Sequence, residues 1–503
     1  MNPKRERFER LKRFLWATGL FLLPITSFRY LPLGSGTQVK PLSLVPFAFL
    51  LALLLLESLL RRKWLFKNSA ILPLLAFILI AMVASGVGFL LAPPNLYEYT
   101  YPNRMLRAWA TFAIGLVFFF VPLAMNRDEE EMNFMLQWLY RGFIMQVVWS
   151  GVQLAYFLFE PYYEELFPHA PLEYLNTLDM IQKTVMMAGL APNHRISGLA
   201  LEPSWLAAQL GSTYLPWLFA AWLSNYFWRR RRWHAIMLGL CLLTALLSFS
   251  RGGLLVIAAA MVLTFLLTGQ AWSRKVWTWW RTPFSQSDIP HRASLLILRL
   301  GIALALFLSA LGAIWGATSH PYFAKLWRSE KSNLVDYFVD IYAGPRLALA
   351  WAGWRIFEQH PWAGVGLGAA GFYLIPALPD WSHFNIPETA QLLASSNTLF
   401  PNIKNLYIRL LAETGIFGFW AFVAFYAFLL GKSLWLARQR PRWLQFTGIS
   451  GVLGCLTIIG LGLSFDSLAN PMIWVTPGLV MGLAENAAGE TPETQSGSAA
   501  ETN

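Results

Sequence analysis

Three arginines and one glutamate stand out because each lies where a polar segment meets a long apolar one. Arg195 and Glu202 belong to the segment R-I-S-G-L-A-L-E-P-S, Arg251 to S-F-S-R-G-G, and Arg346 to G-P-R. Arginine is planar, permanently charged and suited to bidentate binding of phosphate. A carboxylate at the start of a membrane helix is costly to bury unless it is paired. Together the three arginines predict a site that binds a diphosphate group.

Each of these residues also has a structural explanation. A single arginine at a helix end commonly extends to lipid headgroups, and we favour that explanation for Arg107 and Arg409. Glu413 is expected to pair with Arg409 one turn earlier. Glu202 precedes Pro203 and could cap a helix that begins there, where the helix dipole favours a negative charge. The functional alternative is that Glu202 acts as a base or accepts a hydrogen bond from a sugar hydroxyl.

The elements that position these residues are predicted to be membrane helices. Of 503 residues, 56% are hydrophobic and only 13% are charged, which is too apolar for a soluble domain. Apolar runs long enough to cross about 30 Å of hydrocarbon recur along the chain. The sequence therefore predicts an all-α polytopic bundle of about twelve transmembrane helices, within a single domain at 1–485. The expected spans are 14–27, 41–60, 69–92, 105–125, 134–158, 200–226, 235–250, 253–269, 293–315, 406–430, 446–463 and 471–485.

The distribution of basic residues predicts the orientation. When the spans are counted alternately, most of the 39 Lys and Arg fall on one side, which the positive-inside rule assigns to the cytoplasm. Both termini are then cytoplasmic, and the net charge of +12 is mainly a topology signal rather than a nucleic-acid-binding surface. The basic clusters are 4–13, 61–67, 229–232, 274–292 and 432–442.

The longest segment between spans, 316–405, is predicted to be a large extracytoplasmic loop. Gly344 and Pro345 open an amphipathic helix at the outer membrane surface, because proline is favoured at a helix start. Its apolar stripe is expected at Leu347, Ala350, Trp354 and Phe357. The turn H-P-W-A-G-V-G-L-G at 360–368 ends this helix. The segment 486–503 has the composition of a disordered cytoplasmic tail.

Several other chemistries are disfavoured. Gly364 to Gly368 has neither a preceding strand nor a following Lys-Ser/Thr, so a tight turn is favoured over a phosphate loop. Histidines in the outer segments lack metal-ligand spacing, and Cys241 and Cys455 fall inside predicted helices. An Asp-x-Asp pair for a metal-bound nucleotide donor is missing from the outer segments. We therefore expect no metal site, no cofactor and no nucleic-acid partner.

With these motifs the chain resembles the O-antigen ligase and O-antigen polymerase superfamily of bacterial membrane glycan transferases. The resembling segments are R-I-S-G-L-A-L-E-P-S-W-L-A (195–207), S-F-S-R-G-G-L-L (248–255), G-P-R-L-A-L-A-W-A-G-W (344–354), H-P-W-A-G-V-G-L-G (360–368) and N-L-Y-I-R-L-L-A-E-T-G-I-F-G (405–418). The resemblance implies an inner-membrane enzyme whose donor is a glycan linked to undecaprenyl diphosphate and whose acceptor is a glycan or a lipid. It also implies an active site on the outer face that uses no metal.

The chain departs from this family at one position. Ligases of the family typically carry a histidine before the asparagine that opens the late helix, and here Lys404 precedes Asn405. A lysine of ordinary pKa is protonated and cannot act as a base, although it could add charge to the diphosphate site. His383 could replace the missing histidine. Because Glu-Pro-Ser at 202–204 is more similar to the polymerase branch, we favour a polymerase over a ligase.

The expected mechanism is attack by an acceptor hydroxyl on the anomeric carbon of the donor, with departure of the lipid diphosphate. The three arginines, helped by Lys404, would stabilise charge on the leaving group in a partly desolvated site. Glu202 would orient or deprotonate the acceptor, and Asn405 could hold the sugar. A multi-pass transporter or flippase remains the alternative. It is less favoured because transporters place charges near the bilayer midplane.

Overall fold

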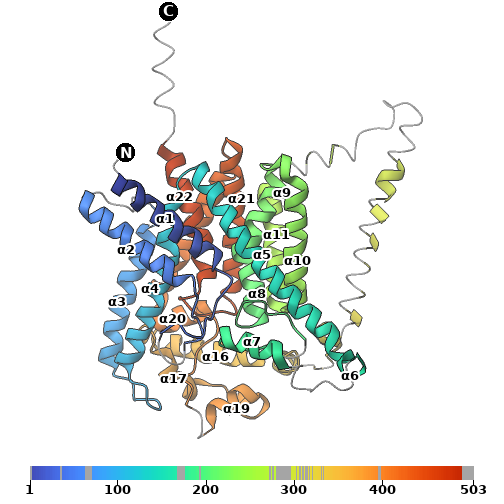
Figure 1. Cartoon of the computed structure of the whole chain (residues 1–503). Helices are drawn as coiled ribbons and strands as arrows, with labels where there is room; N and C mark the ends of the chain where they lie inside the picture. Colours follow the sequence, from blue (N-terminus) through green and yellow to red (C-terminus); the bar gives the residue numbers. More distant parts are fainter. Residues whose placement is uncertain are drawn as a thin grey trace, which may run out of the picture.

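The computed structural model describes residues 3–33, 37–62, 69, 71–166, 176–191, 194–270, 321–329, 331, 333–394 and 398–489, with scattered positions between 274 and 319. Helices dominate this part of the chain, where β-pairing is limited to three isolated bridges. Figure 1 shows long helices side by side, with the start of α1 and the end of α22 at one end of the bundle. We call the opposite end, which holds α7, α16, α17 and α19, the loop face.

The helix bounds are as follows. The long segments are α1 (Pro3–Phe21), α2 (Leu44–Arg61), α3 (Ile71–Leu91), α4 (Tyr101–Met125), α5 (Glu129–Phe159), α8 (Pro203–Gln209) continued by η3 (Leu210–Tyr214) and α9 (Leu215–Ser224), α10 (Arg231–Leu247), α11 (Arg251–Thr268), α20 (Leu406–Leu436), α21 (Arg442–Leu461) and α22 (Val475–Gly489). The shorter ones are η1 (Glu160–Tyr162), α6 (Tyr163–Leu166), α7 (Thr177–Val185), η4 (Trp228–Arg230), α14 (Pro321–Arg328), α15 (Leu334–Asp340), α16 (Gly344–Gln359), α17 (Ala370–Ala377), α18 (Trp381–Asn385), α19 (Pro387–Leu393) and η6 (Pro471–Ile473).

Within the described residues, seven helices are long and apolar enough to cross a membrane: α2, α3, α4, α5 extended by η1, α11, α20 and α21. The other expected spans differ. Helix α1 ends at Phe21 instead of continuing to residue 27, and the π-helix η3 divides the span expected at 200–226. Helices α10 and α22 have 17 and 15 residues. About half of 293–315, and all of the predicted tail beyond Gly489, lie outside the described residues. Twelve spans therefore stay a prediction.

The helices pack through small residues and aromatic rings, as expected where lipid offers no hydrophobic driving force between helices. A methyl group on Gly115 would lie 2.1 Å from the carbonyl oxygen of Leu468, so only glycine allows α4 to approach the segment before α22 so closely. The ring of Trp474 contacts those of Phe119 and Phe425, at centroid separations of 6.3 and 6.1 Å. These contacts join α4, α20 and the start of α22 into one core.

Helix α16 lies against the start of α20. Its predicted beginning at Gly344 and Pro345 is confirmed. The expected stripe is not the face that packs: Trp354 is 44% exposed, whereas the buried residues are Gly344, Ala348, Leu349, Ala352, Gly353 and Ile356. Small residues decide the outcome, because a methyl group on Gly353 would lie only 2.6 Å from the side chain of Ile408 in α20.

Helix α20 is interrupted near its first third. Gly415 adopts φ 66°, outside the helical region, and this break frees backbone carbonyls. The amides of Val365 and Gly366 donate to the carbonyls of Ala412 and Glu413 at 2.9 and 3.0 Å. The glycine-rich segment is thus a turn, as the sequence predicts, and it supplies the hydrogen bonds that the interrupted helix lacks.

Candidate active site

The segment that carries Arg195 lies beside the turn between α10 and α11. The Nε of Arg195 donates to the carbonyl of Ser248 at 3.1 Å, and the amide of Ile196 donates to the carbonyl of Leu247 at 3.3 Å. Arg251 is the first residue of α11, three residues after Ser248. Two of the three predicted arginines therefore belong to neighbouring segments, although they are more than fifty residues apart in the sequence.

The third arginine lies in an element that Arg251 contacts. The Nη1 of Arg251 donates to the carbonyl of Ile341 at 3.5 Å, at the end of α15 and three residues before α16 begins. Arg346 is in the first turn of α16, where its side chain is exposed. Within the described residues it forms no hydrogen bond or ion pair. Arg195 thus contacts the segment that carries Arg251, and Arg251 contacts the segment that leads to Arg346.

Glu202 stands directly before α8, at its N-cap position. Its exposed carboxylate accepts a hydrogen bond from the Ser204 hydroxyl, and it makes no side-chain bond to a backbone amide of α8. Glu202 thus has the N-cap position that the capping explanation predicts, and the helix dipole favours its charge there, although its side chain makes no capping hydrogen bond. Helix α11 approaches α8 closely, because a methyl group on Gly253 would lie 2.8 Å from the Cβ of Ala207. Helix α8, which follows Glu202, therefore lies next to the start of α11, which begins at Arg251.

Two glutamines of α5 hold the loop that follows the first arginine. The Oε1 of Gln153 accepts from the amides of Ser197 and Gly198, at 3.2 and 2.8 Å. The Oε1 of Gln146 accepts from the amide of Leu199 at 3.1 Å. Both glutamines are fully buried. The Nε2 of Gln153 also donates to the carbonyl of Gly198 at 3.2 Å, whereas the Nε2 of Gln146 has no hydrogen-bond partner within the described residues. We call this arrangement of Gln146 and Gln153 the glutamine cradle.

The cradle was not predicted from the sequence, although the sequence contains a signal for it. Gln146, Ser150 and Gln153 recur at four- and three-residue spacing within an apolar run, so they share one face of the helix. Polar residues inside a membrane helix usually face the protein interior. The cradle also explains Gly198, which has φ 58° and where an added methyl group would lie 1.8 Å from the Nε2 of Gln146.

Lys404 and Asn405 both have partners within the protein. The Nζ of Lys404 forms an ion pair with Glu388 of α19 at 2.8 Å. The side chain of Asn405 caps α20 by accepting from the amide of Ile408 at 3.1 Å, and its Nδ2 donates to the carbonyl of Leu463 at 3.2 Å. Asn405 therefore fixes the start of α20, and part of the positive charge expected of Lys404 is balanced by Glu388.

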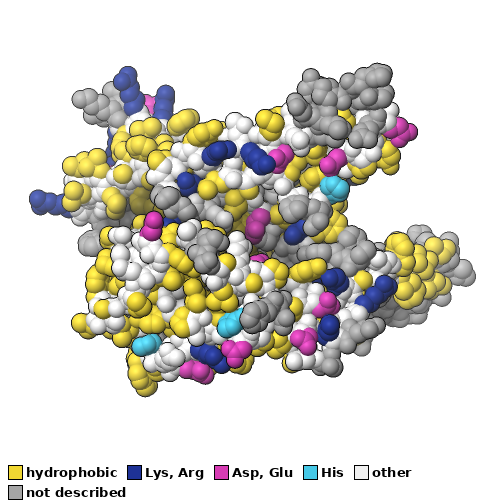
Figure 2. All heavy atoms as spheres, turned by 90° about the horizontal axis from the view of Figure 1, so that it is seen from below, with side chains coloured by type: hydrophobic (Ala, Val, Ile, Leu, Met, Phe, Trp, Pro, Cys, Tyr) yellow, Lys and Arg dark blue, Asp and Glu magenta, His cyan; other side chains and the backbone are white. Residues whose placement is uncertain are grey.

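The remaining sequence predictions fall on the same side of the bundle. His383 is partly buried in α18, which packs against α16 and α19. The expected pairing of Glu413 with Arg409 is confirmed, at 3.1 Å. Figure 2 views the loop face and shows basic and acidic side chains distributed among hydrophobic ones. Within the described residues, no group of three His, Cys, Asp or Glu side chains could hold a metal ion.

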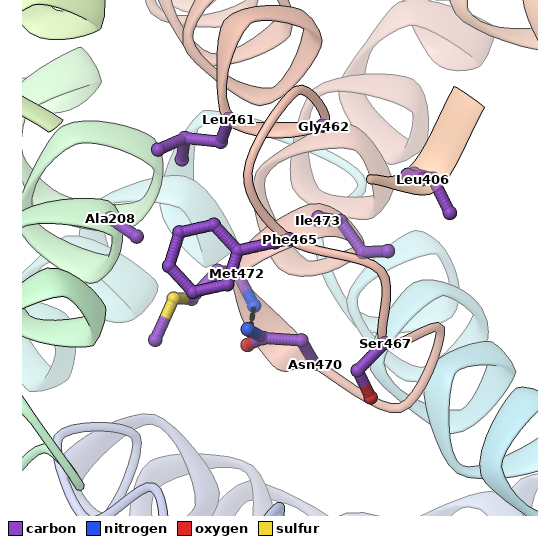
Figure 3. A pocket seen from close by; sticks show the side chains of 9 residues that line it. All are labelled: Ala208, Leu406, Leu461, Gly462, Phe465, Ser467, Asn470, Met472 and Ile473. Carbon is purple, nitrogen blue, oxygen red and sulfur yellow. Dashed lines mark hydrogen bonds between the residues drawn. The ribbon is translucent and has the colours of Figure 1, made fainter. Parts of the chain in front are cut away.

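A small, mainly apolar pocket lies between α8 and the start of α20 (Figure 3). Phe465 projects toward Ala208 across it, and the amide of Met472 donates to the Asn470 side chain at 3.2 Å. The pocket therefore separates the helix that follows Glu202 from the helix that Asn405 caps. Its lining residues are Ala208, Leu406, Leu461, Gly462, Phe465, Ser467, Asn470, Met472 and Ile473.

Residues 236–423 match a family model described as O-antigen ligase. The matched region runs from α10 into α20 and includes Arg251, Arg346, His383, Lys404 and Asn405, whereas Arg195 and Glu202 precede it. A search of curated proteins finds no match for the chain.

Proposed function

We propose that this chain belongs to the O-antigen ligase and polymerase superfamily of membrane glycan enzymes and that it polymerises oligosaccharide repeats linked to undecaprenyl diphosphate. The match of residues 236–423 to an O-antigen ligase family model supports this proposal. The reaction takes place at the loop face, on the outer side of a bacterial inner membrane, and both termini are cytoplasmic. The one-sided distribution of Lys and Arg supports this orientation.

Contacts between the arginine-bearing segments support the proposed location of the active site. Arg195 contacts the turn that leads into α11, and Arg251 contacts the turn that leads into α16. These contacts support a single diphosphate-binding site built from the segments of Arg195, Arg251 and Arg346. An arginine supplies several N–H donors in a plane, which suits the oxygens of a diphosphate.

In the proposed reaction, the oxygen of an acceptor hydroxyl attacks the anomeric carbon of the donor sugar. The bond between that carbon and the diphosphate oxygen breaks, and the three arginines stabilise the negative charge that remains on the lipid diphosphate. Glu202 orients the hydroxyl and takes its proton, a role supported by its exposed carboxylate beside Ser204. Lys404 adds positive charge when it leaves Glu388, and His383 is the second candidate for the base.

Transfer of the glycan to a lipid acceptor is the second candidate function. The family model that matches the chain is described as a ligase, and this description favours the alternative. The chemistry at the donor is the same in both reactions. The two functions differ in the acceptor hydroxyl, which belongs to a second lipid-linked glycan in a polymerase and to a different lipid in a ligase.

The decisive experiment supplies both acceptors to the same preparation. Full-length protein in lipid nanodiscs is incubated with lipid-linked repeat units, with and without a lipid acceptor, in the presence of a metal chelator. A ladder of longer chains without added acceptor supports the polymerase. Transfer only to the added lipid supports the ligase, and loss of all products on chelation contradicts the metal-independent mechanism. A folded protein that makes no product under any condition contradicts the proposed function.

A further inference from the structure

Two further arginines lie at the start of α4 and share no residue with the proposed diphosphate site. Arg104 and Arg107 are three residues apart, so they occupy the same side of the helix. The guanidinium of Arg104 lies 3.8 Å from the ring centroid of Phe400 and 5.6 Å from that of Tyr99. Segments far apart in the sequence thus hold this side chain in place. We call Arg104 and Arg107 the α4 arginine pair.

Within the described residues, no carboxylate forms an ion pair with either arginine of this pair. The Nε of Arg104 is buried and has no hydrogen-bond partner there. The Nη2 of Arg107 donates to the Thr37 hydroxyl at 2.7 Å, which is a neutral partner. Burying a guanidinium while its donors stay unbonded is unfavourable, so an anion from outside the chain would stabilise this arrangement.

The surroundings of Arg104 add positive charge. Arg107 and Arg409 interact with it unfavourably, and both effects are larger than its attraction to Glu413. The charge of Arg409 is already engaged, because its Nε pairs with Glu413 at 3.1 Å and its Nη1 donates to the carbonyl of Asp466 at 2.7 Å. The cluster therefore keeps an excess of positive charge around the unbonded donors of Arg104.

Phosphate fits these donors best. A guanidinium stacked on a ring keeps its N–H groups in the plane of the stack, where they can bind two oxygens of one phosphate. The pair also lies in the first turns of a candidate membrane span, a depth at which lipid headgroups are found. We propose that Arg104 and Arg107 bind the phosphate group of a membrane amphiphile. If the proposed function holds, on which this last step rests, that amphiphile is the acceptor.

Direct binding tests the proposal without depending on activity. Full-length protein in detergent is titrated with short-chain phosphatidic acid and, separately, with a diacylglycerol of the same chains, and bound lipid is measured by native mass spectrometry. Arg104→Gln and Arg107→Gln are each expected to weaken phosphatidic acid binding at least about tenfold, about 1.4 kcal/mol. The matched control is Arg141→Gln, which removes an exposed arginine stacked on Trp138 at 4.3 Å in α5 and should bind as wild type.

Each outcome has a definite meaning. Displacement by inorganic phosphate supports recognition of the phosphate group alone, and resistance to displacement supports recognition of the whole lipid headgroup. Equal binding by wild type and both variants, or equal binding of diacylglycerol, overturns the proposal. Arg104→Lys keeps the positive charge but loses the planar N–H donors. This variant is used instead of Arg104→Gln if Arg104→Gln does not fold. It is expected to show an intermediate loss.

The link to the acceptor is tested by kinetics. Because donor and acceptor are the same kind of molecule in a polymerase, the donor carries a blocked acceptor hydroxyl, and the acceptor is a non-transferable analogue whose sugar is joined to the lipid diphosphate through carbon. With these substrates, Arg104→Gln should raise the KM for the acceptor at least about tenfold, about 1.4 kcal/mol, and leave the KM for the donor unchanged. An equal rise for both substrates contradicts a separate acceptor site. Wild-type protein that binds phosphatidic acid at the α4 arginine pair but transfers no glycan would contradict the proposed function and leave the phosphate site intact.

Discussion

Arg251 makes a contact within the protein and, in the proposed function, also binds the donor diphosphate. It begins α11, and its side chain reaches the carbonyl of Ile341 at the end of α15. One N–H group is used in this contact, and a guanidinium carries five N–H donors in a planar fork. Lysine is not equivalent at such a position, because its ammonium is a point charge and cannot bind two partners in one plane.

We expect Arg251→Ala to reduce glycan transfer by about 10²- to 10³-fold, the usual effect of removing one group that stabilises transition-state charge. Arg251→Lys should lie between this variant and wild type. Transfer rates are measured at equal amounts of folded protein, and the control is Arg355→Ala, an exposed arginine elsewhere on α16. Near-normal glycan chains from Arg251→Ala would contradict the assignment.

Gly198 is a second residue whose identity the structure requires. Alanine there would have to adopt φ 58° and would bring its methyl group 1.8 Å from Gln146. A left-handed alanine costs about 1–2 kcal/mol before the clash is counted, so Gly198→Ala should lower both the melting temperature and the transfer rate. Gly151→Ala in α5 meets nothing within 4 Å and should be neutral or slightly stabilising. Similar behaviour of the two variants in thermal unfolding would contradict the prediction.

At the scale of elements, α5 positions the loop between α7 and α8. Arg195 and Glu202 could be singled out from the sequence because charge is rare beside apolar runs. The hydrogen bonds from this loop to Gln146 and Gln153 could not be predicted, because they depend on which face of α5 lies against the backbone amides of the loop. The same holds for α20, where an apolar run predicts a helix and gives no sign that Gly415 interrupts it. The break is stable only because a distant glycine-rich turn binds there.

Gln153 offers a test of this positioning. Gln153→Leu leaves the amides of Ser197 and Gly198 without their acceptor, at a cost of about 1–3 kcal/mol for each buried group. We expect a lower melting temperature and a lower kcat. Gln153→Glu retains an acceptor oxygen but loses the Nε2 donations to the Oε1 of Gln182 and the carbonyl of Gly198, at 2.6 and 3.2 Å, so it is not expected to restore either quantity. If Gln153→Leu loses stability while kcat is unchanged, the cradle does not position the loop that carries Arg195 and Glu202.

On the scale of the whole molecule, the elements that carry the proposed site lie at the end of the bundle opposite to the start of α1 (Figure 1). The apolar runs predicted most of the long helices. They could not predict how α14 to α19 pack, because these short helices are held by contacts with α20 and with one another. The sequence also placed the packed face of α16 on the wrong stripe, since close packing selected glycine and alanine there over the larger apolar side chains.

Sidedness follows from this arrangement and can be measured in intact cells. Single cysteines replace Arg346 on the loop face and Arg230 in η4, both exposed positions, while native Cys241 and Cys455 are buried. We expect an impermeant thiol reagent to label the cysteine at 346 in intact cells and the cysteine at 230 only after permeabilisation. The reverse pattern would contradict the proposed orientation and with it the outer active site.

The π-helix η3 connects α8 to α9 through a turn that holds one residue more than a regular α-helical turn. One residue corresponds to about 100° of rotation. A regular α-helix without this extra residue would present a different side of α8 to α11. Deleting one residue from Leu210–Tyr214 would therefore rotate the segment next to Glu202 relative to α11.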